Sequence, residues 1–105
     1  MMASLVLCSN EFEDKSGFRY SDTICNKILH LNKIEKSKRE RVISFLDDAC
    51  GLFDSQIYDY NKISNIIKML HTNFEVIDED ILLKIQKFLF MYKQFGMSLF
   101  LVPED

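Results

Sequence analysis

The chain has 105 residues, of which 48% are hydrophobic and 28% are charged, and its formal net charge is −3 at pH 7. This length suits one domain with its own core, and the acidic balance gives no reason to expect a nucleic acid or an anionic membrane as partner. One proline and three glycines argue against a fold rich in loops or strands. We therefore expect a single, mainly helical domain over residues 1–105.

Three cysteines, Cys8, Cys25 and Cys50, form an odd set without C-x-x-C spacing. The apolar run that ends at Cys8 is too short for an export signal and lacks a basic leading segment. No run approaches the length of a transmembrane helix. We expect three reduced thiols that act as small buried hydrophobes in a cytoplasmic protein.

Short apolar runs lie near both ends of the chain, at residues 3–8 (ASLVLC) and 97–102 (MSLFLV). Length alone does not separate a strand from a helical turn in such runs. Their similar character favours two strands that pair beside the helices, and such a ribbon needs helices to cover it.

The first expected helix begins at Ser21 or Asp22, and it ends before a break at Asn32 and Lys33. Its apolar residues recur at helical spacing. They are Ile24, Ile28 and Leu31, with Cys25 and Leu29 beside them.

The second expected helix has the clearest boundaries in the chain. Ser37 and Glu40 stand in the S-x-x-E spacing of a capping box, and Gly51 is a natural stop. The apolar stripe between these signals consists of Val42, Phe45, Leu46 and Ala49.

The third expected helix is capped by Asp54 and Ser55 and continues to about His71. Thr72 and Asn73 break it. Its core stripe is Ile63, Ile66, Ile67 and Leu70, extended backward by Ile57 and Tyr60. Residues 74–77 then form a brief extended connector or a hydrophobic staple for the next helix.

The fourth expected helix, residues 78–95, is the longest element, with Asp78 as N-cap and Gly96 as stop. One broad face carries Ile81, Leu82, Ile85, Phe88, Leu89, Tyr92 and Phe95. Leu83 and Phe90 lie on the opposite side. A helix that is apolar on two sides is central to its domain or offers its second side to another chain, and we expect the central position. The four helices together predict an all-α, compact four-helix domain.

No pattern in the sequence predicts catalysis, a metal site or a cofactor. His30 and His71 each fall near the end of an expected helix, where a histidine interacts with the last carbonyl groups, and neither has ligand-like spacing. The glycines are isolated, so no phosphate-binding loop is present. We expect a protein that is not an enzyme and that needs no cofactor or metal.

Two charged segments are candidate binding sites. The start of the second expected helix carries Lys36, Lys38, Arg39 and Arg41, which suit a DNA-binding regulator as the alternative function. An acidic-aromatic edge consists of Asp47, Asp48, Asp54 and Tyr58, a make-up that suits a protein-binding surface. Within this edge, the stretch FDSQIYDYNK resembles the acidic, tyrosine-bearing turn of small nuclease-inhibiting immunity proteins, although it lacks their following proline and has a different helix order.

The preferred hypothesis is a non-enzymatic protein–protein interaction module, such as a small acidic adaptor or inhibitor. The partner would be another protein or a second copy in a homodimer. The candidate binding residues are either Leu83, Phe90 and Met91 or the acidic-aromatic edge. The abundance of Phe, Ile, Lys, Asn and Tyr without Trp is typical of AT-rich genomes, including those of viruses and phages.

Overall fold

The computed structural model describes residues 3–10, 23–52, 57, 59–94 and 99–105. It shows an α+β domain, so the predicted all-α four-helix bundle is wrong. The elements in chain order are β1 (Ser4–Asn10), β2 (Thr23–His30), a 3-10 turn (Leu31–Lys33), α1 (Lys36–Ser44), a π-helical stretch (Phe45–Ala49), α2 (Tyr60–Thr72), α3 (Glu79–Gln94) and β3 (Leu99–Glu104).

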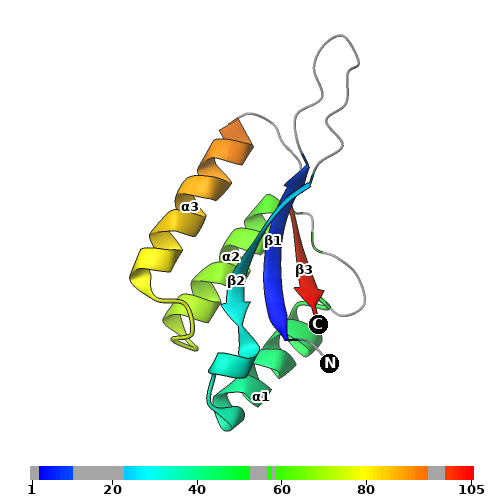
Figure 1. Cartoon of the computed structure of the whole chain (residues 1–105), viewed down its shortest axis with the longest axis vertical. Coiled ribbons are helices and arrows are strands. Elements are labelled where there is room, and N and C mark those ends of the chain that lie inside the picture. Colours follow the sequence, from blue (N-terminus) through cyan, green and yellow to red (C-terminus); the bar gives the residue numbers. More distant parts are fainter. Residues whose placement is uncertain (1–2, 11–22, 53–56, 58, 95–98) are drawn as a thin grey trace.

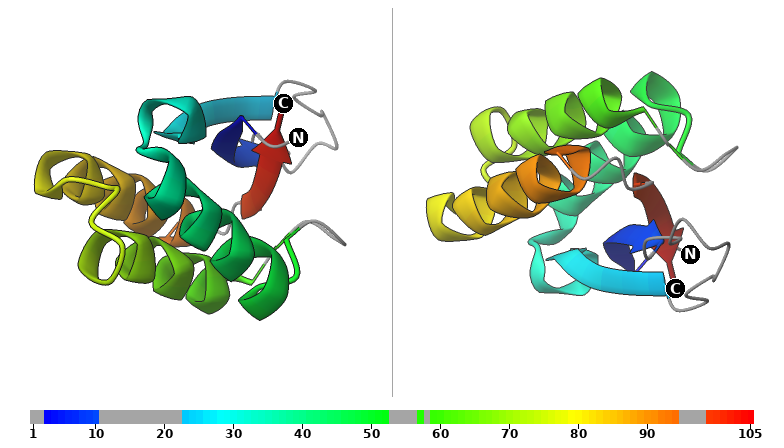
Figure 2. Two further views of the ribbon diagram at one scale, coloured as in Figure 1. Left: turned by 90° about the horizontal axis from the view of Figure 1, so that it is seen from below. Right: turned by 90° about the horizontal axis from the view of Figure 1, so that it is seen from above.

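Among the described residues, β1, β2 and β3 form one antiparallel sheet in the order β2-β1-β3 (Figure 1). The helices all lie on one face of this sheet, which gives the molecule two layers (Figure 2). β1 and β3 pair from Ser4 opposite Glu104 to Ser9 opposite Leu99. The predicted pairing of the two terminal apolar runs is therefore confirmed, although β2 makes the sheet three-stranded.

The predicted helix over residues 21–31 is wrong, because residues 23–30 form β2. A β-bulge explains the misleading pattern. Leu29 pairs with Leu5 and Lys27 pairs with Val6, which leaves Ile28 as an extra residue between the two pairs. A bulge places two consecutive residues against one on the partner strand, and both Ile28 and Leu29 are buried here. The resulting spacing of apolar residues mimics a helical period.

The second predicted helix is confirmed in position, but its predicted cap is wrong. α1 begins at Lys36, and the Glu35 side chain accepts hydrogen bonds from the backbone N–H groups of Ser37 and Lys38 at 3.1 and 3.3 Å. Gly51 ends the helical region, as predicted, with a φ of 65° that suits glycine.

α2 contributes its predicted stripe to the core, since Ile63, Ile66, Ile67 and Leu70 are all buried. Its start differs from the prediction. Asp59 caps the helix by accepting from the backbone of Lys62 at 3.1 Å, and Ile57 pairs with Leu101 of β3 in an isolated bridge. The predicted cap at Asp54 and Ser55 lies outside the described residues.

α3 begins as predicted, with the Asp78 carboxylate accepting from the Ile81 N–H at 2.8 Å. Ile85 and Leu89 are buried in the core. The predicted central position of this helix is wrong, because Leu83 and Phe90 on its other side are exposed. None of the described helices combines the length and the apolar character needed to cross a bilayer.

The prediction of three reduced thiols is wrong for two of them, because Cys8 of β1 and Cys25 of β2 form a disulfide. The two residues are directly opposite each other in the antiparallel pair. Cys50 is buried and unpaired, and burial raises the pKa of its thiol. The predicted cytoplasmic location rested partly on the expectation of three reduced thiols. Because disulfides persist mainly in oxidising compartments, the cysteines no longer support that prediction.

Candidate functional site

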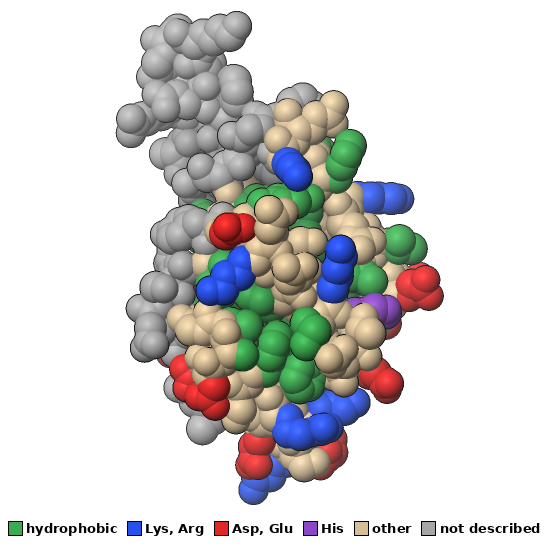
Figure 3. Space-filling model, turned by 180° about the vertical axis from the view of Figure 1, so that it is seen from behind, with side chains coloured by type: hydrophobic (Ala, Val, Ile, Leu, Met, Phe, Trp, Pro, Cys, Tyr) green, Lys and Arg blue, Asp and Glu red, His purple; other side chains and the backbone are tan. Residues whose placement is uncertain are grey.

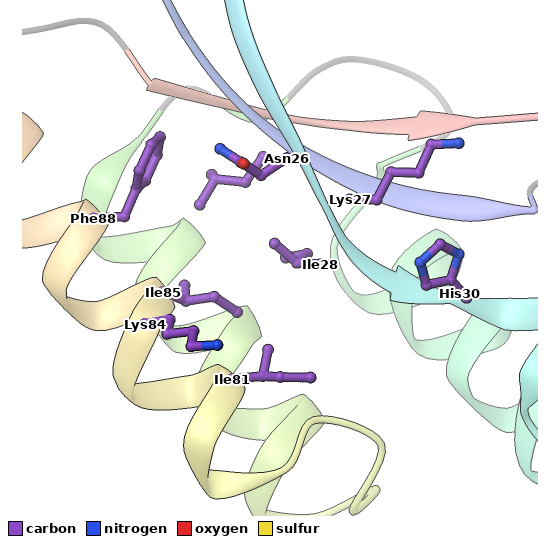
Figure 4. A pocket seen from close by; sticks show the side chains of 9 residues that line it. Asn26, Lys27, Ile28, His30, Ile81, Lys84, Ile85 and Phe88 are labelled. Atoms are coloured by element: carbon purple, nitrogen blue, oxygen red, sulfur yellow. The ribbon is translucent and has the colours of Figure 1, made fainter.

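A groove separates the edge strand β2 from α3, and it has a volume of about 370 Å³. Figure 4 shows Ile28 of β2 and Ile81 and Ile85 of α3 directed into this space. The groove is thus mainly apolar at its base. Its lining residues are Leu7, Asn26, Lys27, Ile28, His30, Ile81, Lys84, Ile85 and Phe88.

The charged lining of the groove is basic. Lys84 extends from α3 toward β2, whereas Lys27 points away from α3 (Figure 4). The Lys27 ammonium is 3.3 Å from a carboxylate oxygen of Glu104, so β3 already neutralises it. No Asp or Glu is among the described residues that line the groove. Lys84 therefore supplies a positive charge that no described carboxylate of the groove lining offsets.

The pairing of β2 with β1 determines which backbone groups face the groove side. The Cα atoms of Cys8 and Cys25 are 4.1 Å apart. This separation is typical of a non-hydrogen-bonded antiparallel pair, for which about 4.5 Å is usual. Pairs alternate along the ladder, so Asn26 bonds to β1, while the N–H and C=O groups of Cys25 and Lys27 point to the outer edge.

The outer face of α3 is a second apolar surface, separate from the groove. Phe90 is 65% exposed and Leu83 is 49% exposed, while Met91 beside them is 44% exposed. At 100° per residue, Leu83 and Phe90 lie on nearly the same line along the helix, well away from Ile81 and Ile85. We call these three residues the outer face of α3. In Figure 3, which views the helical side, apolar side chains appear among the charged ones.

The acidic-aromatic edge is only partly visible in the structure. Asp47 and Asp48 are exposed on the π-helical stretch between α1 and Gly51. Asp54 and Tyr58 lie outside the described residues. The two described acids alone do not define a binding surface, so this site stays a prediction.

The predicted basic site is on α1. Lys36 and Arg41 are exposed, and Lys38 and Arg39 are partly buried. Two carboxylates interrupt this charge, because Glu35 caps the helix and Glu40 lies within it. Nucleic-acid binding through α1 stays a prediction, and no described contact favours it.

The histidines do not form a site. His30 ends β2 and lines the groove, so its predicted place at a helix end is wrong. His71 lies in the last turn of α2, but its Nδ1 is 2.7 Å from the carbonyl oxygen of Ile77, in the connector to α3. Within the described ranges, no group of three or more His, Cys, Asp or Glu residues is placed to hold a metal ion.

The chain matches no protein-family model, and comparison with curated proteins and with solved structures gives no significant match. The spacing of Leu83 and Phe90 predicted correctly that they share one side of α3, although burial of that side was the expected outcome. Sequence reasoning missed the groove, because it assigned β2 to a helix and therefore had no strand edge to place beside α3.

Proposed function

We propose that this protein is a non-enzymatic protein–protein interaction module that binds through the outer face of α3. The observation that carries this proposal is the 65% exposure of Phe90 together with the 49% exposure of Leu83 two turns earlier. Exposed apolar area is unfavourable in water by about 25 cal/mol per Å². A partner that covers these side chains recovers that free energy, and aromatic residues are enriched at such interfaces.

The opposite side of α3 fixes the outer face in place. Leu89 and Ile85 are buried against the core, and the Lys93 ammonium lies 4.6 Å from the centre of the Tyr60 ring on α2. A helix anchored along one side loses little further conformational freedom when its other side binds. This arrangement supports a preformed binding surface for another protein or for a second copy of the chain.

The test compares wild type with the double variant Leu83→Ser/Phe90→Ser. Light scattering at two concentrations measures self-association, and a pull-down from the cells that make the protein measures binding to other proteins. We expect the double variant to lose whichever association wild type shows, because two apolar contacts are replaced by small polar side chains. Its thermal unfolding should stay close to that of wild type, because both residues are exposed.

Met69→Ser is the matched control. Met69 is also a large apolar residue at the surface, 37% exposed on α2, but it lies outside the outer face of α3. The control should associate as wild type does. Association that survives in the double variant, or a double variant that unfolds, contradicts the proposal, and the second result assigns Leu83 and Phe90 to the core.

A further inference from the structure

We propose that the groove between β2 and α3 accepts an extended, acidic segment of another protein, which adds to the free edge of β2 as a fourth strand. This inference goes beyond the proposed function because it uses the side of α3 that faces β2, and because its main contacts are backbone hydrogen bonds. The outer face of α3 takes no part in it.

The outer edges of β3 and β2 differ in their backbone hydrogen bonding. On β3, Leu101 exchanges two backbone hydrogen bonds with Ile57, at 2.9 and 3.2 Å, so the chain itself protects that edge. On β2, no backbone among the described residues pairs with the outward N–H and C=O groups of Cys25 and Lys27. An unpaired edge of this kind is a template for an added strand.

The groove provides space for the side chains of such a strand. α3 lies beyond β2 on the side away from β1, so it extends past the edge of the sheet (Figure 1). Adjacent strands are separated by about 4.8 Å, and alternate side chains point to the same face. Every second residue of an added strand would therefore project toward α3, where Ile81 is 40% exposed and Ile85 forms part of the base.

Charge selects the kind of partner. An acidic residue in the added strand would pair with Lys84, which no carboxylate in the described lining of the groove neutralises. A second copy of the chain fits less well. If the β2 strand of a second copy were the added strand, it would offer Lys84 no carboxylate, because β2 contains no Asp or Glu. The favoured occupant is therefore a different protein with alternating apolar residues and at least one Asp or Glu.

The experiment uses a library of short random peptides displayed on phage and selected on the full chain with its disulfide intact. The enriched peptides are then synthesised, and their affinity is measured by fluorescence anisotropy. We expect enriched sequences in which apolar residues alternate and an acidic residue recurs. In hydrogen exchange, the bound peptide should protect the amides of Cys25 and Lys27, whereas the Asn26 amide is already bonded to β1 and should change little.

Lys27→Pro and Lys27→Thr form a matched pair of variants. Both remove the Lys27–Glu104 ion pair, but only proline removes the outward N–H group. We expect Lys27→Pro to bind the peptide about tenfold or more weakly than Lys27→Thr does, the equivalent of one hydrogen bond. Should Lys27→Pro fail to fold, Lys84→Glu serves instead, and it should reverse the preferred peptide charge from acidic to basic.

Three results would overturn the inference. The first is a library that yields no enriched peptide. The second is a set of peptides that bind folded Lys27→Pro as tightly as Lys27→Thr, that bind Lys84→Glu as tightly as wild type, or that leave the Cys25 and Lys27 amides unprotected. The third is loss of peptide binding in Leu83→Ser/Phe90→Ser, which would place the peptides on the outer face of α3. Binding that this double variant retains supports the groove even if the proposed function fails.

Discussion

At the scale of single residues, Glu35 shows how a local hydrogen bond replaces an expected one. The S-x-x-E spacing predicted that Ser37 would cap the helix, but the N-cap of α1 is Glu35, two residues earlier. Glu35 accepts from the Ser37 hydroxyl at 2.8 Å and from two backbone N–H groups. These bonds favour the ionised carboxylate and lower the pKa of Glu35 below its ordinary value, with the Ser37 hydroxyl as the largest cause.

The lowered pKa of Glu35 leads to a prediction about pH. Because the folded pKa lies below the unfolded pKa, the cap contributes stability above the unfolded value and loses it as the pH falls through the folded value. We expect Ser37→Ala to raise the pKa of Glu35 toward 4.5, its ordinary value. NMR titration of the Glu35 carboxyl carbon measures this change. Ser44→Ala, at the other end of α1, is the control, and an unchanged pKa in Ser37→Ala would contradict the assigned cause.

At the scale of elements, the sequence predicted α2 and α3 correctly but misassigned β2. The stripes of α2 and α3 repeat over several turns, so the helical period is unambiguous, and residues such as Ile63 and Leu89 are buried as expected. In β2, by contrast, the bulge leaves the consecutive residues Ile28 and Leu29 both buried. A bulge depends on the partner strand, so the spacing within residues 23–30 did not reveal it.

The difference between local and long-range patterns also explains why the shared side of Leu83 and Phe90 was predicted and the groove was not. Leu83 and Phe90 belong to one helix, so their spacing alone indicates that they share a face. The groove joins Ile28 to Ile85 across two elements that are far apart in the chain. No local pattern records such a contact. Only the strand order β2-β1-β3, which places β2 at an edge, brings these residues together.

Gly51 gives a testable prediction at this scale. Its φ of 65° lies in the left-handed region, and no atom of the described residues lies within 4 Å of the position that a Cβ atom would occupy. The cost of Gly51→Ala therefore comes from backbone conformation alone, and we expect a loss of about 1–2 kcal/mol in the free energy of unfolding. Urea denaturation measures it. Gly51→Asn should lose less, because asparagine tolerates this conformation better, and equal losses would contradict the conformational explanation.

At the scale of the whole molecule, the Cys8–Cys25 disulfide constrains the sheet. It joins residues that are 17 positions apart and ties the edge strand β2 to the central strand β1. Cross-links of about this loop length stabilise by about 3 kcal/mol, mainly by restricting the unfolded chain. The same bond holds the edge that is proposed to accept a partner strand.

We expect reduction of this disulfide to lower the free energy of unfolding by about 3 kcal/mol. Urea denaturation with and without a thiol reductant measures the change, and Cys25 is exposed, so the reductant can reach the bond. The control is Cys8→Ala/Cys25→Ala, whose stability should be low and insensitive to the reductant. If the stability of wild type does not change on reduction, the disulfide makes no contribution.

The order of the strands also affects how the chain assembles. β1 can pair with β2 early in folding, because the two strands are close in the sequence. β3, by contrast, follows α1, α2 and α3 in the sequence. Contacts between such distant segments form slowly, because a long loop must close first. Until β3 pairs with β1, one edge of β1 is unpaired near Leu5 and Leu7. Both side chains are buried completely or almost completely in the folded protein. Aggregation is therefore expected during refolding. The yield of soluble protein should be lower when refolding is carried out at high protein concentration than at low concentration.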